Sequence, residues 1–254
     1  MANLAHLFNI RSDVTFLNHG SFGACPTEVF EVYQNWQREL EAQPVEFIGR
    51  RGEALLRAAR QELATYLGTA AENLVFVTNA TVGLNTITRS LRLREGDQIL
   101  TTNQEYGAME KMWTYICGRR GCQIIRSSIP LPVESSEQVV EAIWQGVTSR
   151  TKVLFISHIT SPTALTLPLH PLVARARAQN IVTVIDGAHG PGQLALNLDD
   201  LHADFYVGNC HKWMMAPKGT GFLYVHPDYQ SQVEPLVVSW GWHPDRTRAS
   251  YLVD

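Results

Sequence analysis

Residues 181–213 read IVTVIDGAHGPGQLALNLDDLHADFYVGNCHKW and contain two apolar runs of strand length, each followed at once by polar residues. The first run, 181–185, leads into DGAH at 186–189, and the second, 205–208, leads into NCHKW at 209–213. Both runs are nearly continuous in apolar residues and show no regular alternation with polar ones, which is typical of strands that helices cover on both faces. The stretch therefore predicts two strands of an α/β sheet with polar side chains gathered where they end.

The same pattern continues on both sides of this stretch. Strands are predicted at 74–78, 98–102, 123–127, 153–157, 181–185, 205–208 and 221–225. Helical periodicity occurs at 28–41, 51–67, 81–93, 108–119, 134–147 and 171–179, and it places Trp36, Trp113 and Trp144 on core-facing sides. We expect an α/β fold with a mostly parallel seven-stranded sheet and helices on both faces. Residues 1–73 should form an N-terminal arm with helices, and residues 74–242 a large domain.

The composition excludes several classes of protein. Of 254 residues, 45% are hydrophobic and 18% charged, which suits a substantial core and lacks the signature of disorder. A net charge of −3 argues against a nucleic-acid-binding module or a basic membrane-surface protein. We find no apolar run near the ~20 residues of a membrane span and no signal-peptide pattern. Four cysteines without CxxC spacing favour a reduced, cytoplasmic protein.

Lysine is rare, so chemistry that needs a lysine has few candidates. The four lysines are Lys111, Lys152, Lys212 and Lys218. Lys111 falls in a predicted helix, Lys152 in a polar lead-in to a strand, and Lys218 in a Pro-Lys-Gly turn. Lys212 directly follows a buried strand, where an amine loses solvation and its pKa falls, which activates it as a nucleophile. By elimination, Lys212 is the best candidate for covalent chemistry.

The other strand ends supply polar groups that suit pyridoxal phosphate. That cofactor needs a lysine for a Schiff base, a carboxylate for its pyridinium nitrogen and a cradle for its phosphate. Asp186 offers the carboxylate, although an Asp there is also compatible with a loop cap or a metal site. Ala80 and Thr81 begin a predicted helix whose free N–H groups suit a phosphate, although TNAT is also typical of a simple N-cap. Tyr106 offers an aromatic platform, and the partner of the ring oxygen is either His189 or Ser161.

Two other kinds of site fit less well. Asp186, His189 and His211 are possible metal ligands, but HxH and HExxH spacings are absent, and we predict no metal. A nucleotide site lacks GxxxxGK[ST], and residues 187–192 lack the GxGxxG spacing. A non-enzymatic protein that retains the fold remains a third possibility.

Six motifs together resemble a known family. They are LNHGSFG at 17–23, VTNAT at 77–81, SPT at 161–163, DGAH at 186–189, GNCHKW at 208–213 and APKGTG at 216–221. Over residues 17–242 the chain resembles the class V aminotransferase family of fold-type I pyridoxal phosphate enzymes. Within it, the chain is most similar to the isopenicillin N epimerase-like group, which is related to the cysteine desulfurases.

The resemblance implies a role for each candidate residue. Lys212 would form the Schiff base with the cofactor, and Asp186 would hold the pyridinium nitrogen. His189 and Ser161 would lie near the phenolic oxygen, and Tyr106 would stack on the ring. The phosphate would be held by Ala80, Thr81, Asn209 and His211.

The resemblance also implies an activity and an assembly. We expect a homodimer that removes the Cα proton of an amino acid, with epimerisation as the outcome. A cysteine desulfurase or C–S lyase is the alternative, as is a truncated, catalytically impaired cofactor-binding protein. Members of the family carry a small C-terminal domain with an arginine for the substrate carboxylate. We expect that domain to be largely absent here, with residues 243–254 as the start of its connection.

Overall fold

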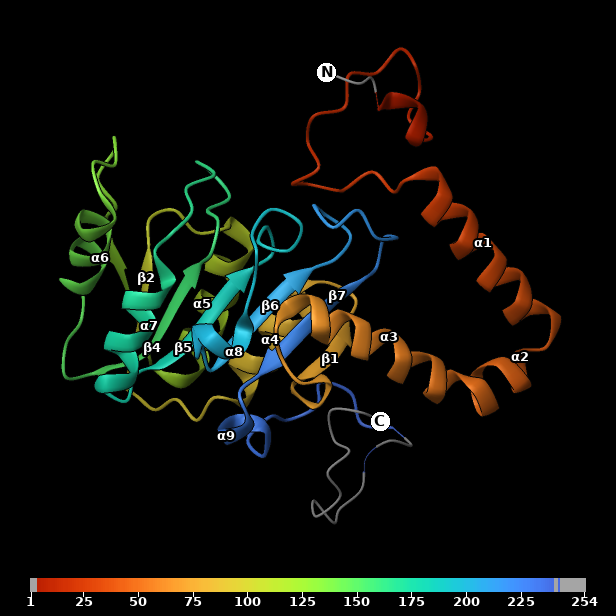
Figure 1. Cartoon of the computed structure of the whole chain (residues 1–254). Coiled ribbons are helices and arrows are strands. Elements are labelled where there is room, and N and C mark those ends of the chain that lie inside the picture. Colours follow the sequence, from red (N-terminus) through yellow and green to blue (C-terminus); the bar gives the residue numbers. More distant parts are fainter. Residues whose placement is uncertain (1–3, 240–241, 243–254) are drawn as a thin grey trace.

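One seven-stranded sheet runs through the residues that the computed structural model describes, 4–239 and 242 (Figure 1). Its strands are β1 (Leu74–Val77), β2 (Gln98–Thr102), β3 (Gln123–Ser127), β4 (Thr151–Ser157), β5 (Val182–Gly187), β6 (Phe205–Asn209) and β7 (Gly221–Val225). They lie in the order β1-β7-β6-β5-β4-β2-β3, in which β7 is antiparallel to β1 and β6 and every other neighbouring pair is parallel. The predicted α/β class and mostly parallel sheet are confirmed.

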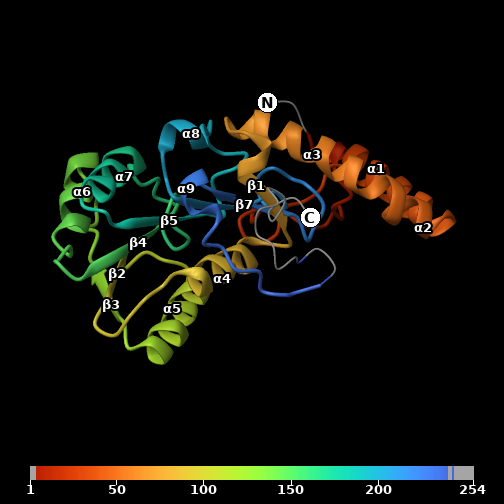
Figure 2. The same ribbon diagram turned by 90° about the horizontal axis from the view of Figure 1, so that it is seen from below.

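Helices cover both faces of the sheet, as expected (Figure 2). The described helices are α1 (Thr27–Ala42), α2 (Pro44–Glu46), α3 (Gly52–Leu67), α4 (Ala80–Ser90), α5 (Gly107–Arg120), α6 (Ser136–Trp144), α7 (Leu169–Ala178), α8 (Leu198–Leu201) and α9 (Pro227–Gln230). Two 3-10 helices, η1 (Ala5–Leu7) and η3 (Ala71–Asn73), and a π-helical segment, η2 (Phe47–Arg51), complete them. In Figure 2, α3, α6, α7 and α8 lie on one side of the sheet and α4 and α5 on the other. The sequence did not predict α8 and α9, because four residues are too few to show a helical period.

The apolar spacing within each helix explains which face it buries. In α4, Ala80, Leu84 and Ile87 recur at helical intervals and are at most 4% exposed. They join a core that includes Trp113 of α5 and Phe155 of β4, while α6, α7 and α8 share a second core on the opposite face. Because Leu84 and Ile87 are fully buried, truncating either to Ala would cost about 2–5 kcal/mol of stability.

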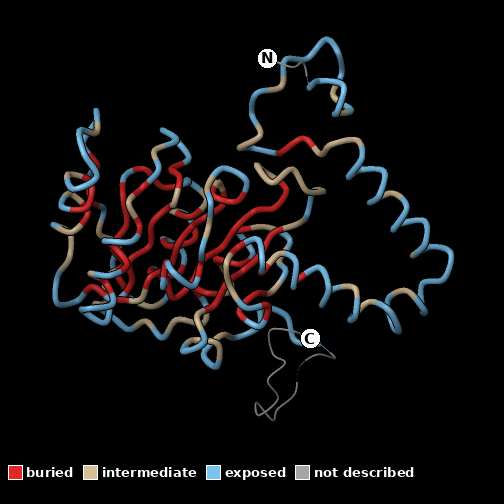
Figure 3. The backbone as a smooth tube through the Cα atoms, in the orientation of Figure 1, coloured by how far each residue is buried: buried red, intermediate tan, exposed pale blue. Residues whose placement is uncertain are grey.

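The N-terminal helices depart from this pattern. α1, α2, η2 and α3 form an elongated hairpin that projects from the sheet and is largely exposed (Figures 1 and 3). Trp36 on α1 was predicted to lie in the core, but this is wrong, since it is 39% exposed. No residue of α1 is buried, because within the described residues α1 packs mainly against α2 and η2. Trp113 is buried as predicted, and Trp144 packs against the core while partly exposed.

Strand register brings several loops to one edge of the sheet. Ser157 of β4 pairs with Asp186 of β5, and the last residues of β5 pair with those of β6, so three carboxyl ends lie side by side. Gly221, the first residue of β7, pairs with both Val77 and Asn209. That double pairing places the start of α4, which follows β1, beside the end of β6.

Two further observations bear on the sequence predictions. Within the described residues, no helix is both long and apolar enough to cross a membrane. Residues 243–254, predicted as the start of a connection to a small domain, lie outside the described residues.

Candidate active site

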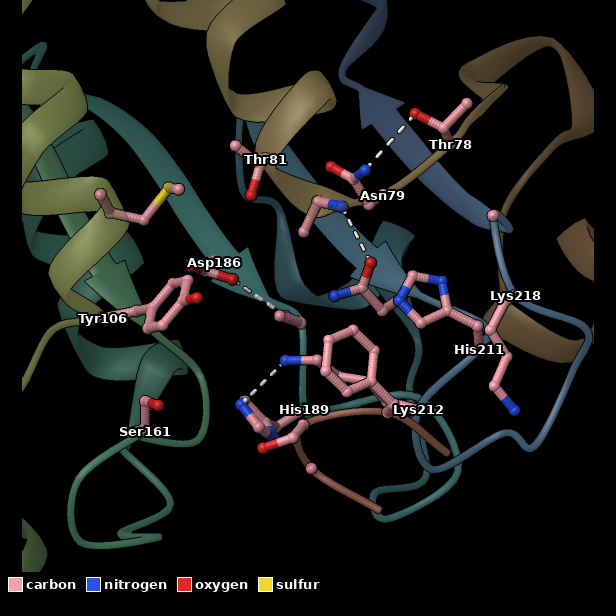
Figure 4. A pocket seen from close by; sticks show the side chains of 18 residues that line it. Thr78, Asn79, Thr81, Tyr106, Ser161, Asp186, His189, His211, Lys212 and Lys218 are labelled. Atoms are coloured by element: carbon pink, nitrogen blue, oxygen red, sulfur yellow. Dashed lines mark hydrogen bonds between the residues drawn. The ribbon is translucent and has the colours of Figure 1, made fainter. Parts of the chain in front are cut away.

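A cavity of about 430 Å³ opens at this edge of the sheet (Figure 4). All nine site residues predicted from the sequence line it: Ala80, Thr81, Tyr106, Ser161, Asp186, His189, Asn209, His211 and Lys212. The remaining lining residues are Gly20, Ser21, Phe22, Thr78, Asn79, Met109, Ala188, Lys218 and Gly219. The cavity therefore collects side chains from loops that are up to 199 positions apart in the sequence.

Asp186 is an almost completely buried carboxyl at the end of β5. Burial raises its pKa, while the N–H of Ala188, which donates to Oδ1 at 3.0 Å, and the charge of Lys212 lower it. Its second oxygen, Oδ2, accepts no hydrogen bond from any described residue. The side chain thus offers an open acceptor inside the cavity, and a cationic N–H donor there would offset the penalty of burying its charge.

Lys212 lies beside His189 rather than in solvent. Its Nζ is 3.2 Å from Nε2 of His189 (Figure 4). Burial lowers the pKa of Lys212, and the charge of Asp186 opposes this shift in part. Burial and the charge of Lys212 also lower the pKa of His189, to about 4, so the imidazole is neutral at physiological pH. An amine with a lowered pKa is available as a nucleophile or a base.

The start of α4 is held by two asparagines. The side chain of Asn79 accepts the N–H of Val82 at 3.0 Å as the N-cap, and Oδ1 of Asn209 accepts the N–H of Ala80 at 2.8 Å. The resemblance implies that Ala80 helps to hold the phosphate, and in the structure its N–H donates to Asn209. Thr81 is the next residue, and both its N–H and its hydroxyl lack a hydrogen-bond partner among the described residues. Because the first N–H groups of a helix have no intrahelical acceptor, Thr81 provides the free donors at this helix start.

His211 contributes in a more restricted way than the sequence suggested. Its Nδ1 lies 2.8 Å from the carbonyl oxygen of Thr220, which can only accept, so the Nδ1 hydrogen donates there. In the neutral ring Nε2 is then an acceptor, and it donates to an anion only when the ring is protonated. Burial lowers the pKa of His211, so a bound anion would have to raise it again.

Tyr106 and Ser161 lie across the cavity from His211 and Lys218 (Figure 4). Tyr106 is the N-cap residue of α5 and is 50% exposed, with its ring at the cavity wall. Ser161 lies in the exposed turn after β4. Their side chains make no hydrogen bond to any described residue, so both remain free for a ligand.

One wall of the cavity is an N-terminal segment that sequence reasoning did not assign to the site. Gly20, Ser21 and Phe22 form this wall. The segment is tied down at Gly23, whose N–H donates to the carbonyl of His211 at 2.9 Å and whose carbonyl accepts from Nζ of Lys218. A Cβ on Gly23 would lie 2.0 Å from the carbonyl oxygen of Lys212, so only glycine allows this approach. The available signal is the motif LNHGSFG at 17–23, which in the sequence supports only the resemblance to the family.

Sequence reasoning also missed Glu105, a buried carboxyl behind the cavity. Oε1 accepts the hydroxyl of Thr102 at 2.6 Å, and Oε2 accepts the N–H and hydroxyl of Ser157 at 3.0 and 2.5 Å. Burial raises the pKa of Glu105 to about 7, and the charge of Asp186 adds to the rise. The only signal was a polar stretch just past the strand at 98–102.

These features fit the predicted cofactor better than a metal ion. In residues 4–239 and 242, no group of three or more His, Cys, Asp or Glu side chains could hold a metal. Pyridoxal 5′-phosphate instead requires a lysine amine, a carboxylate for a ring N–H and donors for a phosphate. The cavity provides Lys212, the open oxygen of Asp186 and the donors of Thr81, each from a different loop. The residues present therefore fit this group.

Comparisons with known proteins identify the family. Residues 17–242 match the model of the family aminotransferase class V. The chain is 38% identical over 247 residues to an isopenicillin N epimerase of Amycolatopsis lactamdurans, covering 96% of this chain and 62% of that protein. It is 30% identical over 244 residues to an L-cysteine desulfhydrase-like protein of Epichloe uncinata, covering 93% of this chain and 52% of that protein.

The fold has solved counterparts. A structure of a C-DES mutant with glycine covalently linked to its pyridoxal phosphate cofactor superposes with a TM-score of 0.84 at 24% identity, over 95% of this chain and 64% of that one. The chain thus spans about three fifths of the length of several proteins that it matches. The family match over most of the chain and the fit of the cavity confirm the predicted cofactor, pyridoxal 5′-phosphate. The chain belongs to the aminotransferase class V family.

Proposed function

We propose that this chain is an enzyme that removes the Cα proton of an amino acid, with epimerisation at Cα as the outcome. The observation that carries the proposal is the meeting of Asp186 and Lys212, from the ends of adjacent parallel strands, in one cavity. The similarity to isopenicillin N epimerase over 96% of the chain supports epimerisation as the outcome. The predicted cytoplasmic location and homodimer are part of the same proposal.

The cofactor and the protein have separate tasks. When bound, pyridoxal 5′-phosphate supplies an aldehyde that condenses with amines and a protonated ring that takes up the electrons of a broken Cα–H bond. Asp186 would accept a hydrogen bond from the ring nitrogen through its open oxygen and favour the protonated ring. Thr81 would donate to the phosphate, and His211 would do so in its protonated form. Tyr106 would cover one face of the ring, with His189 or Ser161 as donor to the phenolic oxygen.

Lys212 would move the proton. Burial lowers the pKa of its amine, which would increase the share of the neutral form that can accept a proton. A neutral amine accepts the Cα proton and later returns a proton to carbon. Inversion at Cα requires that a proton returns to the face opposite to the one from which the first proton was removed. An epimerase would therefore need a second acid on that opposite face.

Elimination of a β-substituent is the second candidate. It begins with the same proton removal by Lys212 and differs in whether a sulfur group leaves before the proton returns. The similarity at 30% identity to an L-cysteine desulfhydrase-like protein favours it specifically.

Absorbance spectroscopy tests the cofactor site first. We expect the purified chain to turn yellow with added pyridoxal phosphate, and borohydride to remove the band and leave the cofactor attached to the Lys212 peptide. Lys212→Ala should lose the band, whereas Lys111→Ala, which removes an exposed helical lysine, should keep it. A band that survives in Lys212→Ala would contradict the assignment of the lysine.

Incubation with amino acids in D2O tests the reaction. Epimerisation predicts deuterium at Cα together with loss of optical purity, measured by mass spectrometry and chiral chromatography. Elimination predicts release of sulfide and pyruvate from L-cysteine. Absence of Cα exchange for every amino acid tried, in a protein that holds the cofactor, would contradict both reactions.

A further inference from the structure

The side chain of Trp213 makes a contact that neither the motifs nor the proposed reaction uses. Its indole N–H donates to Nδ1 of His189 across 3.1 Å. The opposite nitrogen of that imidazole, Nε2, lies 3.2 Å from Nζ of Lys212. Trp213, His189 and Lys212 therefore form a continuous chain of hydrogen bonds that ends at the reactive amine.

The backbone of Trp213 is packed against one residue, and its indole lies close to two others. Gly192 adopts a φ of +87°, and a Cβ there would lie 2.4 Å from the carbonyl carbon and oxygen of Trp213. The ring of His19 lies 5.8 Å from the indole, centroid to centroid. A Cβ on Gly20 would lie 3.3 Å from the indole and 3.1 Å from the imidazole of His189. Because the surroundings are this close, the indole N–H has a fixed direction.

The chemistry of the two nitrogens then fixes where the proton lies. An indole N–H donates and never accepts, so Nδ1 of His189 must carry a lone pair. The pKa of His189 lies at about 4, so the ring is neutral near pH 7 and carries a single hydrogen. That hydrogen must be on Nε2, where it faces Lys212. A neutral amine can accept it, whereas an ammonium has no lone pair to offer.

We propose that Trp213 is a positioning residue that locks His189 as its Nε2–H tautomer and thereby presents a hydrogen-bond donor to the amine of Lys212. The contact favours the neutral amine over the ammonium. For the bound cofactor the inference rests on the proposed function. The phenolic oxygen of pyridoxal phosphate is attached beside its aldehyde carbon, so a donor next to Lys212 is also the group that this oxygen needs.

Other titratable groups surround the pair and remain in place when Trp213 is changed. Asp186 at the end of β5 acts on Lys212, and its charge raises the pKa of the amine. His211, after β6, and Lys218, before β7, also line the cavity. A change at Trp213 that leaves these three residues intact therefore reports on the hydrogen-bond chain.

Nitrogen NMR reads the tautomer directly, in the full chain without cofactor. Two-bond ¹H–¹⁵N correlations of ¹⁵N-histidine-labelled protein distinguish protonated from unprotonated ring nitrogens, and His189→Gln identifies the signals. We expect Nε2 protonated and Nδ1 unprotonated in the wild-type protein and in Trp36→Phe, which removes an indole on the projecting hairpin. In Trp213→Phe we expect the Nδ1–H form to appear. A protonated Nδ1 in the wild-type protein overturns the inference without any variant, and so does an unchanged tautomer in a folded Trp213→Phe.

The pKa of Lys212 gives a second readout. The rate at which Lys212 is acetylated, measured by peptide mass spectrometry at several pH values, gives this pKa. In Trp213→Phe we expect the pKa to be higher by about one pH unit, because the freed imidazole can accept a hydrogen bond from the ammonium. Trp36→Phe should not shift it, and an equal shift in both variants would overturn the inference. Cofactor binding is scored separately by absorbance. A colourless protein with the stated tautomer contradicts the proposed function and supports the role of Trp213.

Discussion

Replacing Glu105 with Gln should change how the stability of the protein depends on pH. Glu105 is 7% exposed, and its two carboxyl oxygens accept three hydrogen bonds from Thr102 and Ser157. Gln has nearly the same shape and cannot ionise. The substitution therefore removes the titration of this site, together with at least one hydrogen bond whose loss is independent of pH.

The size and sign of the effect follow from the raised pKa. Burial raises the pKa of Glu105 from 4.5 to about 7, so between these values the folded state holds a proton that the unfolded state has released. The free energy of unfolding then falls as pH rises through this window. Below pH 4.5 both states are protonated and the effect is absent. Above pH 7 it reaches its full size, about 3 kcal/mol of lost stability.

Denaturant unfolding at several pH values between 4 and 8 measures this difference. We expect the stability of the wild-type protein, relative to Glu105→Gln, to fall by about 3 kcal/mol from the lowest pH to the highest. Glu110→Gln, which removes a half-exposed carboxylate of α5 that pairs with Arg126 of β3, controls for the loss of one negative charge. A difference between wild type and Glu105→Gln that stays constant with pH, or that grows in favour of the wild type, would refute the reasoning.

Three further changes test the cavity itself. Asp186→Asn keeps an oxygen for the N–H of Ala188 but loses the charge, so Cα exchange in D2O should slow by about 100-fold or more while the protein stays folded. Asn209→Ala leaves the N–H of Ala80 buried without an acceptor, which should cost about 1–3 kcal/mol in denaturant unfolding and weaken cofactor binding measured by absorbance titration. Gly23→Ala places a Cβ 2.0 Å from the carbonyl of Lys212, so limited proteolysis should cut the N-terminal segment faster and cofactor affinity should fall. Gly49→Ala, where a Cβ meets nothing within 4 Å, should leave proteolysis and affinity unchanged, and equal behaviour of the two glycine variants would argue against a docked segment.

The sheet and most of the cavity were predictable because both follow from local pattern. Nearly continuous apolar runs mark the central strands, and the residues just beyond them are polar in a protein whose core is apolar. Parallel strands bring such residues to one edge of the sheet, so Asp186 and Lys212 could be placed together from order alone. All nine predicted residues line the cavity for this reason.

What escaped prediction depends on contacts between distant segments. The role of Trp213 follows from a positive φ at Gly192 and from packing against Gly20, and neither leaves a mark near Trp213 in the sequence. In the sequence, Glu105 is an ordinary carboxylate just past a strand. Its raised pKa comes from burial, and two of its hydrogen bonds come from Ser157 of β4, 52 residues away. The prediction that Trp36 lies in the core was wrong because a local pattern was present but no core element among the described residues covers it. An apolar stripe on a helix shows that one face is apolar, but not which element covers it.

The antiparallel β7 also constrains when the protein can acquire its site during synthesis. In the described sheet β1 has one strand partner, and Val77 pairs with Gly221, which lies 144 residues further along the chain. At ribosomal rates of about 5–20 residues per second, Gly221 is synthesised roughly 7 to 30 s after Val77, so β1 lacks its strand partner during that interval. Until β7 emerges, the β1 edge is unpaired and the end of β6 lacks the neighbour that sets Asn209 against Ala80. A nascent chain paused before Gly221 thus exposes bare strand edges of the kind that chaperones shield, and cofactor loading must follow translation through β7.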